Sequence, residues 1–380
     1  MIRVERIDPA SRRQLRAFID FPHDLYVGDP NYVPMLYMEQ EALLNPKKSP
    51  FFLHSTAEYF MAFDNGRPMG RIAAILNRNH IAFTGRREGF FGFFDVMNDE
   101  RAAAALLNAA EQWLRQQGVK KVIGPANFST NETCGLLVEN FDRPPMVMMT
   151  YNAPYYAALL EGLGFVKHVD LLCYWLTREG MPASVMEMAR QLEERLAQRG
   201  IVIRKINMRH FQEELNKFLP VYNASWAENT GFVPMTDAEI RQIARDLRPV
   251  IDPKLVFFAE KDGQTIGVSL MVPNINEILI RLRRGRLFPF GIFRLLFGLR
   301  RVRTARVIAL GTLKEYRRLG IDTCFYVRTY QAAVQRGIVE GEASWILENN
   351  TLMNRALEHI GARVYRRYRL YEKTLEHGAS

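Results

Sequence analysis

The residues Arg317-Arg318-Leu319-Gly320-Ile321-Asp322 combine a glycine with basic side chains in a way that could hold an anionic group. They lie between an apolar segment, residues 305–310, and a helical pattern at 321–335. At a strand-to-helix turn, consecutive backbone N–H groups and the positive end of the helix attract phosphate. A plain helix start with solvated arginines is the alternative, since glycine between basic residues is a weak motif by itself. The apolar strand and helix on either side favour the phosphate-binding turn.

A second segment is strongly basic. Nine arginines and no acidic residue lie between Arg281 and Arg306, so most of the formal net charge of +10 comes from this stretch. The arginines flank two apolar runs, 287–293 and 295–299, a pattern that suits an anionic membrane surface. Packing onto its own domain and a nucleic-acid patch are the alternatives. The membrane interpretation assigns lipid contacts to Phe288, Phe290, Phe293 and Phe297.

A polar run at residues 127–135 could also do chemistry. It contains Asn127 and Asn131 among serine and threonine residues. Such clusters usually form hydrogen-bonded loops. The alternative is a loop that contacts substrate through these two asparagines, because clefts between domains are favoured binding places.

The second half of the chain supplies the elements that would position the phosphate-binding turn. A strand is followed by two helices, a hairpin around Lys261-Asp262-Gly263-Gln264, and then strand, helix, strand, helix and strand. We predict strands at 201–206, 255–260, 265–272, 305–310, 342–347 and 364–371, and helices at 208–228, 237–247, 321–335 and 351–359. This order predicts an α/β fold with a mixed sheet.

The first half repeats the order with different residues. Its hairpin turns at Asp64-Asn65-Gly66, whose residues tolerate positive φ. We predict strands at 2–7, 58–63, 70–76, 90–96 and 121–124, and helices at 12–19 and 99–117. Two copies of one plan are therefore expected in tandem.

Length and composition agree with two folded domains. A chain of 380 residues exceeds what one hydrophobic core usually organises, and we expect domains at 1–185 and 186–380. The first residues lack the apolar core of a signal peptide, and no stretch approaches the roughly 20 apolar residues that span a bilayer. These features predict a cytoplasmic protein.

Signatures of metal and nucleophile chemistry are weak. Cys134, Cys173 and Cys324 occur singly, and the seven histidines show no paired ligand spacing. The sequence also lacks a nucleophile elbow and a Walker motif. We therefore predict no metal.

In segment order and length, each half of the chain resembles the GNAT superfamily of acyl-CoA N-acyltransferases. The resemblance is more specific in the second half and extends to a bacterial tandem-GNAT group that includes bacterial ceramide synthases. The closer match is carried by Trp226-Ala227-Glu228-Asn229-Thr230-Gly231-Phe232-Val233-Pro234 and Trp345-Ile346-Leu347-Glu348-Asn349-Asn350. It implies two tandem GNAT-like domains, of which the second uses acyl-CoA as donor substrate.

The resemblance assigns the CoA pyrophosphate to the turn at 317–322. The family pattern is Arg or Gln, two residues, Gly, one residue, then Gly or Ala; Asp322 departs from it, and its carboxylate would repel phosphate unless it turns away. The matching turn of the first half, residues 96–101, has two acids and no glycine, which implies a degenerate first domain. The residues assigned to acyl-CoA are Leu310, Gly311, Arg317, Arg318, Leu319, Gly320, Ile321, Asp322, Asn350 and Asn354, with a helix cap as the alternative for the two asparagines.

N-acylation needs one group that takes a proton from the amine and one that protonates the leaving thiolate. For the first we expect Glu348, after the predicted strand 342–347, in preference to Glu342 at its start; a helix-cap role is the alternative. For the second, the family often places a tyrosine where Tyr365 and Tyr368 stand, although alternate aromatics also suit a half-buried strand.

The loop that follows the helix at 208–228 usually faces the acceptor in GNAT folds. By position, the resemblance assigns acceptor contacts to Trp226, Glu228, Asn229 and Phe232. The two aromatic residues equally suit a core position.

Three functions follow from these features. The leading one is an N-acyltransferase on the inner face of the cytoplasmic membrane that moves a long-chain acyl group from CoA, or from acyl carrier protein, to a lipid amine such as a sphingoid base. The runner-up is a soluble acetyltransferase for a small amine or peptide. The third is a non-catalytic scaffold that binds lipid or acyl-CoA. No nucleic-acid partner is expected.

Overall fold

The computed structural model describes residues 1–229 and 231–375, which form two compact units. The first unit contains Met1–Leu171, Ile278–Arg294 and the chain from Arg367 onward. The second contains Leu172–Glu277 and Leu295–Arg366. The boundary expected from the sequence, between residues 185 and 186, falls inside helix α6 (Ala183–Gln198), whereas the contacts divide the chain after Leu171.

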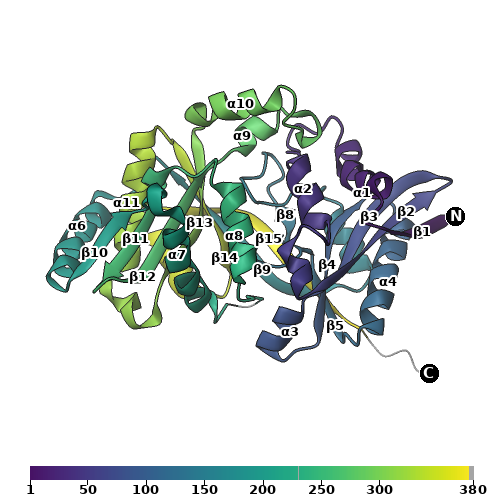
Figure 1. Ribbon diagram of the computed structural model, residues 1–380, viewed down its shortest axis with the longest axis horizontal. Coiled ribbons are helices and arrows are strands. Elements are labelled where there is room, and N and C mark those ends of the chain that lie inside the picture. The colour runs from purple at the N-terminus through teal and green to yellow at the C-terminus, as the bar shows by residue number, and fades with distance from the viewer. Residues whose placement is uncertain (230, 376–380) are drawn as a thin grey trace. The chain divides into compact units, whose positions relative to one another are not determined.

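The first unit is a mixed sheet with helices on both faces (Figure 1). Its strand order is β1-β2-β3-β4-β5, antiparallel except for the parallel pair β4 and β5. The last part of β15 (Arg363–Thr374) pairs antiparallel with β5 and with β8. The other elements are β1 (Ile2–Ile7), α1 (Arg12–Leu25), α2 (Tyr37–Leu44), β2 (Thr56–Asp64), β3 (Arg67–Leu76), α3 (Arg78–Thr84), β4 (Glu88–Val96), α4 (Glu100–Gln116), β5 (Lys121–Gly124), β6 (Ala126–Asn127), β7 (Thr133–Cys134), β8 (Leu136–Glu139), α5 (Tyr156–Gly162) and β9 (Val166–Thr177), which continues into the second unit.

Local sequence explains the main elements of this unit. The hairpin between β2 and β3 turns at Asn65 and Gly66, which have φ of 50° and 81°. Asp99 caps α4 by accepting hydrogen bonds from the N–H groups of Arg101 and Ala102. The apolar face of α4, with Ala103, Leu106 and Ala110, packs on Ile72 and Ala74 of β3.

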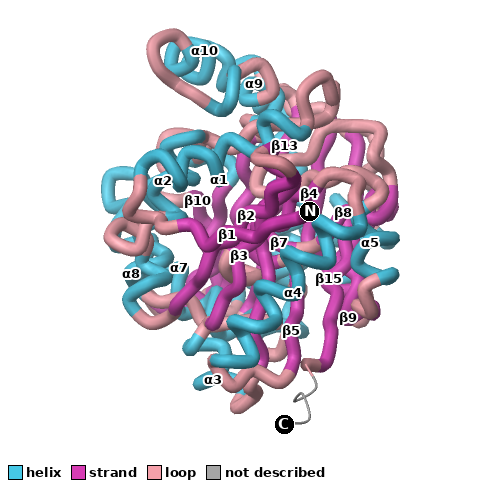
Figure 2. Tube along the Cα trace, turned by 90° about the vertical axis from the view of Figure 1, so that its right-hand side faces the viewer, coloured by secondary structure: helices cyan, strands magenta, loops and turns pink. Residues whose placement is uncertain are grey.

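The second unit repeats the same plan. Its strand order is β10-β11-β12-β13-β14, antiparallel except for the parallel pair β13 and β14. Its first strand is followed by two helices and a hairpin, and strands and helices alternate only in the last part; Figure 2 colours strands magenta and helices cyan. The elements are β10 (Ile201–Lys205), α7 (Phe211–Trp226), α8 (Asp237–Leu247), β11 (Val256–Lys261), β12 (Gln264–Pro273), β13 (Thr304–Thr312), α11 (Ile321–Arg336), β14 (Glu340–Leu347) and α12 (Thr351–His359). Between β12 and β13 lie α9 (Asn276–Leu279) and α10 (Gly291–Gly298), each of which falls partly in the first unit.

Helices cover both faces of the second sheet. Phe218 and Val221 of α7 and Ile240 of α8 pack with Phe258 and Val268. On the opposite face, α6 and α11 pack through residues that include Leu196, Ile321 and Phe325 against Phe257, Ala259 and Ile266. The expected α/β class with tandem GNAT-like units is thus confirmed. Among the described residues, no helix is both long enough and apolar enough to cross a membrane.

Candidate functional site

The strands β13 and β14 pair over part of their length and then separate. Thr304–Val307 pair in parallel with residues 340–343, and these are all the pairs between the described parts of the two strands. Ile308 is an extra residue of β13, because Val307 lies opposite Met271 whereas Ala309 lies opposite Leu270. Such a bulge bends a strand and leaves a residue unpaired. The carboxyl ends of β13 and β14 therefore form an opening in the sheet.

The turn predicted to hold phosphate follows the open end of β13. Residues Lys314–Leu319 form a short 3-10 helix, and α11 begins at Ile321. Gly320 between them has φ 81° and ψ 16°, a left-handed conformation that glycine adopts without steric strain. No side chain of the described residues caps α11. Its first N–H groups lack intrahelical partners and suit an anion.

Asp322, the departure from the GNAT pattern, is directed toward β13. Its Oδ1 accepts a hydrogen bond of 2.5 Å from the Thr312 hydroxyl. Burial raises the pKa of the Asp322 carboxyl, and the Thr312 hydrogen bond and the Arg317 charge act against this rise. The carboxylate does not cap the helix, so it leaves the N–H groups of the turn available to a phosphate.

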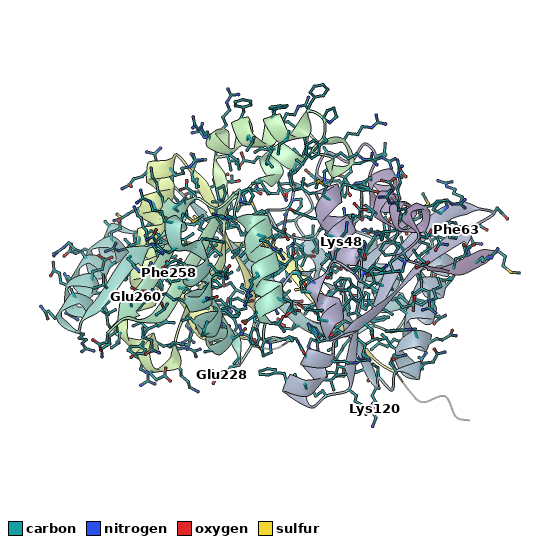
Figure 3. The ribbon with its side chains drawn as sticks, in the orientation of Figure 1. Lys48, Phe63, Lys120, Glu228, Phe258 and Glu260 are labelled. Atoms are coloured by element: carbon teal, nitrogen blue, oxygen red, sulfur yellow. The ribbon has the colours of Figure 1, made fainter. Side chains whose placement is uncertain are left out.

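Arg317 joins the turn to the end of α7. Its Nε donates to the Thr312 carbonyl at 3.3 Å and its Nη2 to the Ser225 carbonyl at 3.2 Å. The exposed Glu228, labelled in Figure 3, has one carboxylate oxygen 2.8 Å from Nζ of Lys314 and the other 3.5 Å from Nη1 of Arg317. Glu228 thus forms ion pairs with the basic groups that an anionic ligand of this turn would contact.

Four polar side chains form a buried network where β13 and β14 are still paired. Arg306 and Glu342 lie opposite each other, and Nε of Arg306 is 3.6 Å from Oε1 of Glu342. Arg306 also donates to the Ser344 hydroxyl at 2.8 Å, and that hydroxyl donates to Glu342. Tyr365 of β15 donates its hydroxyl to the other Glu342 oxygen. The network thus lies at the closed end of the opening.

Burial and charge determine the protonation of this network. Burial raises the pKa of the Tyr365 hydroxyl well above its ordinary value, and the Glu342 carboxylate raises it further. Burial likewise raises the pKa of the Cys173 thiol, followed by the effect of Glu342. Tyr365 therefore stays protonated and able to donate, while Cys173 is unsuited to act as a thiolate nucleophile.

The sequence also predicted catalytic roles for Glu348 and Tyr368. Glu348 directly follows β14, and its carbonyl accepts a hydrogen bond of 3.1 Å from Nδ2 of Asn354. Tyr368 is three residues beyond Tyr365 on β15, so the two side chains leave opposite faces of the strand. Tyr368 is fully buried in the first unit, where its hydroxyl donates to the Thr150 carbonyl at 3.0 Å. The carboxylate that contacts Tyr365 is that of Glu342, which the sequence offered as the second choice, after Glu348, for the group that takes the proton from the amine.

Asn350 and Asn354 organise the start of α12. Asn350 caps the helix by accepting a hydrogen bond of 3.2 Å from the Met353 N–H. Asn354 donates to the carbonyls of Leu347 and Glu348 and accepts from the Tyr174 hydroxyl at 3.1 Å. Both asparagine side chains thus make hydrogen bonds at the start of α12. A role there was the alternative to contact with acyl-CoA.

The predicted acceptor loop packs against the open end of β13. A Cβ at Gly311 would come within 2.7 Å of the Trp226 ring, which itself stacks on Tyr222 with a centroid distance of 4.6 Å. Phe232 is buried, and its N–H donates to the Asn229 carbonyl. Thr230, inside this loop, lies outside the described residues.

The remaining residues assigned to acyl-CoA divide between core and surface. Leu310 and Ile321 are buried in the core beneath α11, and Leu319 packs against that core. Arg318 is exposed. The turn therefore offers its backbone and its two arginines to a ligand, while its apolar side chains anchor it.

An apolar cavity lies beneath the opening, on the α11 side. It measures about 80 Å³ and is lined by side chains of β13, β14, α11 and α12, including Val307, Leu310, Tyr326, Ala333 and Ala343. Val307 and Leu310 flank the bulge at Ile308. The cavity therefore adjoins the place where the two strands part.

In the first unit, the place where β4 and β5 separate is filled by residues that follow β5. After Phe90, the last residue of β4 that pairs with β5, a Cβ at Gly92 would lie 1.9 Å from the Ala126 carbonyl oxygen. The N–H of Phe93 donates to Oδ1 of Asn127 at 2.7 Å, and Nδ2 of Asn127 donates to Thr133 at 2.9 Å. The Asn127 amide is thus used inside the unit.

Two other features of the first unit agree with a self-contained structure. The N–H of Asn131 donates to the Ser129 hydroxyl at 3.2 Å, as expected for a hydrogen-bonded loop. Asp99 occupies the N-terminus of α4, and its carboxylate is also 2.8 Å from Arg101. The position that would receive a phosphate in this copy therefore already holds a carboxylate.

The basic segment is only partly a surface patch. Phe288, Phe290, Phe293 and Phe297 are 68%, 73%, 56% and 75% exposed. Arg306, however, is 2% exposed, and the expectation that all nine arginines form one patch is wrong for this residue. The reason is that β13 carries Arg306 into the sheet, where it pairs with Glu342.

Arg306, Ser344 and Cys173 are site residues that the sequence did not identify. Arg306 was hidden by the arginines around it, and Ser344 by the acidic residues of the same strand. An arginine within an otherwise apolar strand is the signal that could have revealed Arg306, since buried polar groups need partners. Among the described residues no group of three or more potential metal ligands occurs; His377 lies outside them.

Comparison with known proteins supports this assignment of the fold. No family model matches the chain. Protein YghO of Escherichia coli strain K12 is 38% identical over 371 residues, covering 96% of this chain and 94% of that protein. Bacterial ceramide synthase of Caulobacter vibrioides is 37% identical over 369 residues, covering 95% of each.

Solved structures with low sequence identity share the fold. A tandem GNAT protein from the clavulanic acid biosynthesis pathway aligns over 100% of both chains, with a TM-score of 0.59 and 11% identity. A GCN5-related N-acetyltransferase from Sphaerobacter thermophilus aligns over 100% of this chain and 97% of its own, with a TM-score of 0.52 and 15% identity. The expected resemblance to tandem GNAT proteins and to bacterial ceramide synthases is therefore confirmed.

Proposed function

We propose that this chain, which belongs to the family of bacterial ceramide synthase and Protein YghO, is an N-acyltransferase. It transfers a long-chain acyl group from acyl-CoA to the amine of a lipid such as a sphingoid base. The name of the Caulobacter vibrioides relative supports this acceptor, because a ceramide is an N-acylated sphingoid base.

The observation that carries the proposal is the opening between β13 and β14. The Arg317–Gly320 turn stands at its open end, and the Glu342–Tyr365 pair stands at its closed end. A donor whose pyrophosphate binds the N–H groups of α11 would direct its acyl end into the opening. The thioester would then reach the buried Glu342 carboxylate and the Tyr365 hydroxyl that donates to it.

The paired side chains supply the proton transfers. The amine nitrogen attacks the thioester carbon, the C–N bond forms and the C–S bond breaks. The amine proton passes to the Tyr365 oxygen as the tyrosine proton passes to Glu342, and the pair returns one proton to the departing thiolate. Arg306 and Ser344 hold Glu342 in place through the ion pair and hydrogen bonds described above.

The apolar cavity supports a long acyl chain over an acetyl group. Its walls carry few polar groups, and it adjoins the bulge at Ile308, next to the expected thioester. An acyl tail in this cavity would exclude water from the reacting carbon. The exposed phenylalanines of the basic segment support a peripheral position on the inner face of the cytoplasmic membrane, because aromatic side chains insert at interfaces where arginines attract anionic lipids.

The donor assignment is tested by calorimetry of acyl-CoA binding. Replacing Arg317 by Glu and Gly320 by Val reverses one positive charge and disfavours the left-handed conformation, and it should abolish binding. Arg336→Ala is the matched control, because it removes an arginine at the other end of α11. Unchanged affinity in the turn variant would contradict the phosphate assignment.

The reaction is tested by mass spectrometry of the protein incubated with acyl-CoAs of several lengths and a sphingoid base. An N-acylated base formed from long-chain donors is expected. Product from acetyl-CoA alone would replace the proposal with a soluble acetyltransferase, and lipid binding without product from any donor would indicate a scaffold.

Liposome flotation tests the membrane contact. Phe288→Ser with Phe290→Ser and Phe297→Ser should abolish flotation with anionic vesicles and leave acyl transfer in detergent unchanged. Flotation equal to that of the unchanged protein would contradict the contact.

A further inference from the structure

A cavity of about 600 Å³ lies in the first unit, at the basic segment, and seven of its ten lining residues are arginine or phenylalanine. Five arginines line it: Arg16, Arg283, Arg284, Arg286 and Arg294. Ligand-binding cavities in proteins commonly fall between about 300 and 1,000 Å³. The volume is therefore sufficient for a small organic ligand.

The positive charge of this cavity is only partly neutralised. Asp20 lies 3.4 Å from Arg16 and 3.1 Å from Arg284, and Asp24 accepts a further hydrogen bond from Arg284. These two carboxylates are the acidic partners of the lining. Arg283, Arg286 and Arg294 have no carboxylate partner among the described residues, so three guanidinium groups keep an uncompensated charge.

The cavity has a fixed frame. A Cβ at Gly285 would lie 1.8 Å from the Met35 carbonyl oxygen, so the segment touches the backbone of the first unit there and only glycine fits. Arg286 stacks its guanidinium 4.8 Å from the Tyr37 ring centre, and Arg294 donates to the Arg281 carbonyl at 3.2 Å. Together with the Arg284 ion pairs, these contacts hold the arginines in a defined arrangement without a ligand.

The rim of the cavity is apolar and open to solvent. Phe288 and Phe290 line the cavity, and both rings are mostly exposed. Arginine forms paired hydrogen bonds with the oxygens of phosphate, whereas exposed phenylalanine gains free energy when hydrocarbon covers it. A ligand that satisfies both parts has a phosphate group attached to apolar chains.

We propose that this cavity binds the phosphate-bearing headgroup of an anionic phospholipid, with Arg283, Arg286 and Arg294 on the phosphate and Phe288 and Phe290 against the acyl chains. It is a stoichiometric ligand site and not a diffuse contact with a charged surface. The assignment of a membrane lipid as the ligand rests on the membrane association proposed above. The existence of the site does not depend on acyl transfer.

The test uses the full chain and a short-chain lipid in monomeric form. Dihexanoyl phosphatidylglycerol is titrated into the protein below its critical micelle concentration, and one saturable site per chain is expected. Arg283→Ala with Arg286→Ala should weaken binding by roughly tenfold for each arginine removed, because each variant side chain loses charge-assisted hydrogen bonds to the phosphate.

Two further variants separate a site from diffuse attraction. Arg300→Ala with Arg301→Ala removes the same charge from exposed arginines that do not line the cavity, and binding should stay unchanged. Arg286→Lys keeps the charge but loses the planar fork of guanidinium, and binding should weaken. Equal weakening by both double variants, or no effect of Arg286→Lys, would overturn the site.

Titrations with soluble phosphates identify the kind of ligand. Inorganic phosphate and glycerol 1-phosphate should bind at least about tenfold more weakly than the lipid, because they cannot cover the two phenylalanines. Equal affinity for these soluble phosphates would overturn the lipid assignment. Acyl transfer in detergent by each variant shows that the variant is folded, so loss of lipid binding with normal acyl transfer supports the site alone.

Discussion

The hydroxyl of Tyr365 donates a hydrogen bond to the carboxylate of Glu342 inside the second unit. The two residues are 23 positions apart in the chain, on β15 and β14. Arg306 and Ser344 complete the surroundings of the carboxylate. This contact is the reason that we propose Glu342 and Tyr365 as the acid and base groups.

Glu342→Gln and Tyr365→Phe should each lower kcat by roughly 10²- to 10⁴-fold, the usual contribution of general acid and base groups. The affinity for acyl-CoA should stay unchanged, because neither residue belongs to the turn at 317–320. Tyr368→Phe is the matched control and should retain activity, since its hydroxyl bonds the Thr150 carbonyl. Similar losses for Tyr365→Phe and Tyr368→Phe would remove the special role of Tyr365.

Glu228→Gln should tighten acyl-CoA binding by roughly two- to fivefold. The carboxylate now lies at Lys314 and Arg317, and a phosphate must displace it. Exposed ion pairs contribute little, so the gain is small. Calorimetry at low salt measures it, with Glu315→Gln, another exposed acid of the same turn, as control. Weaker binding of acyl-CoA by Glu228→Gln would contradict this prediction, because it would show that the carboxylate contributes to acyl-CoA binding.

Asp322→Asn should stabilise the protein at neutral and alkaline pH. Burial raises the pKa of this carboxyl in the folded chain above its ordinary 3.8, so ionisation of Asp322 opposes folding. That opposition is absent below the unfolded pKa and grows as pH rises through the folded pKa. Thermal unfolding should therefore give a higher Tm for the variant at pH 8, and the difference should vanish as pH falls below about 4. A difference that is constant with pH would assign the effect to the Thr312 hydrogen bond.

Ala333→Phe should shorten the acyl chain that the protein prefers. Ala333 lines the apolar cavity beneath the opening, and a ring there would occupy space that we assign to the acyl tail. Each methylene excluded from an apolar pocket changes kcat/KM by about 10- to 200-fold. Competition between donors of different length measures the shift, with Gln331→Phe, at an exposed position of α11 outside the cavity lining, as the control. An unchanged preference would place the tail elsewhere.

Asn127→Ala should lower the stability of the first unit without changing acyl-CoA affinity. It leaves the buried N–H of Phe93 without its acceptor, which costs about 1–3 kcal/mol. Chemical unfolding measures the loss, and Asn131→Ala is the control in the same loop. A raised KM for the acceptor with unchanged stability would restore the substrate-contact role that the sequence suggested for Asn127.

Individual elements show where reasoning from the sequence succeeded. The hairpin around Asp262 and Gly263 was predicted from its turn residues, and these have φ of 49° and 78°. The helix predicted at 12–19 continues to Leu25 with Pro22 inside it, because its buried face packs against the sheet of the first unit. Helix α6 was not predicted, although its residues alternate apolar and charged positions at helical spacing.

The sequence by itself determined two copies of an α/β plan and the turn at Gly320, to which we assign the phosphate. These features depend on local properties, namely the period of apolar residues and the φ angles that glycine permits. The tertiary structure decided that Glu342 contacts Tyr365, that Arg306 is buried, and that Asn127 fills the first opening. Each of these depends on strand register and on contacts between residues distant in the chain, where a shift of one residue reverses the face on which a side chain lies.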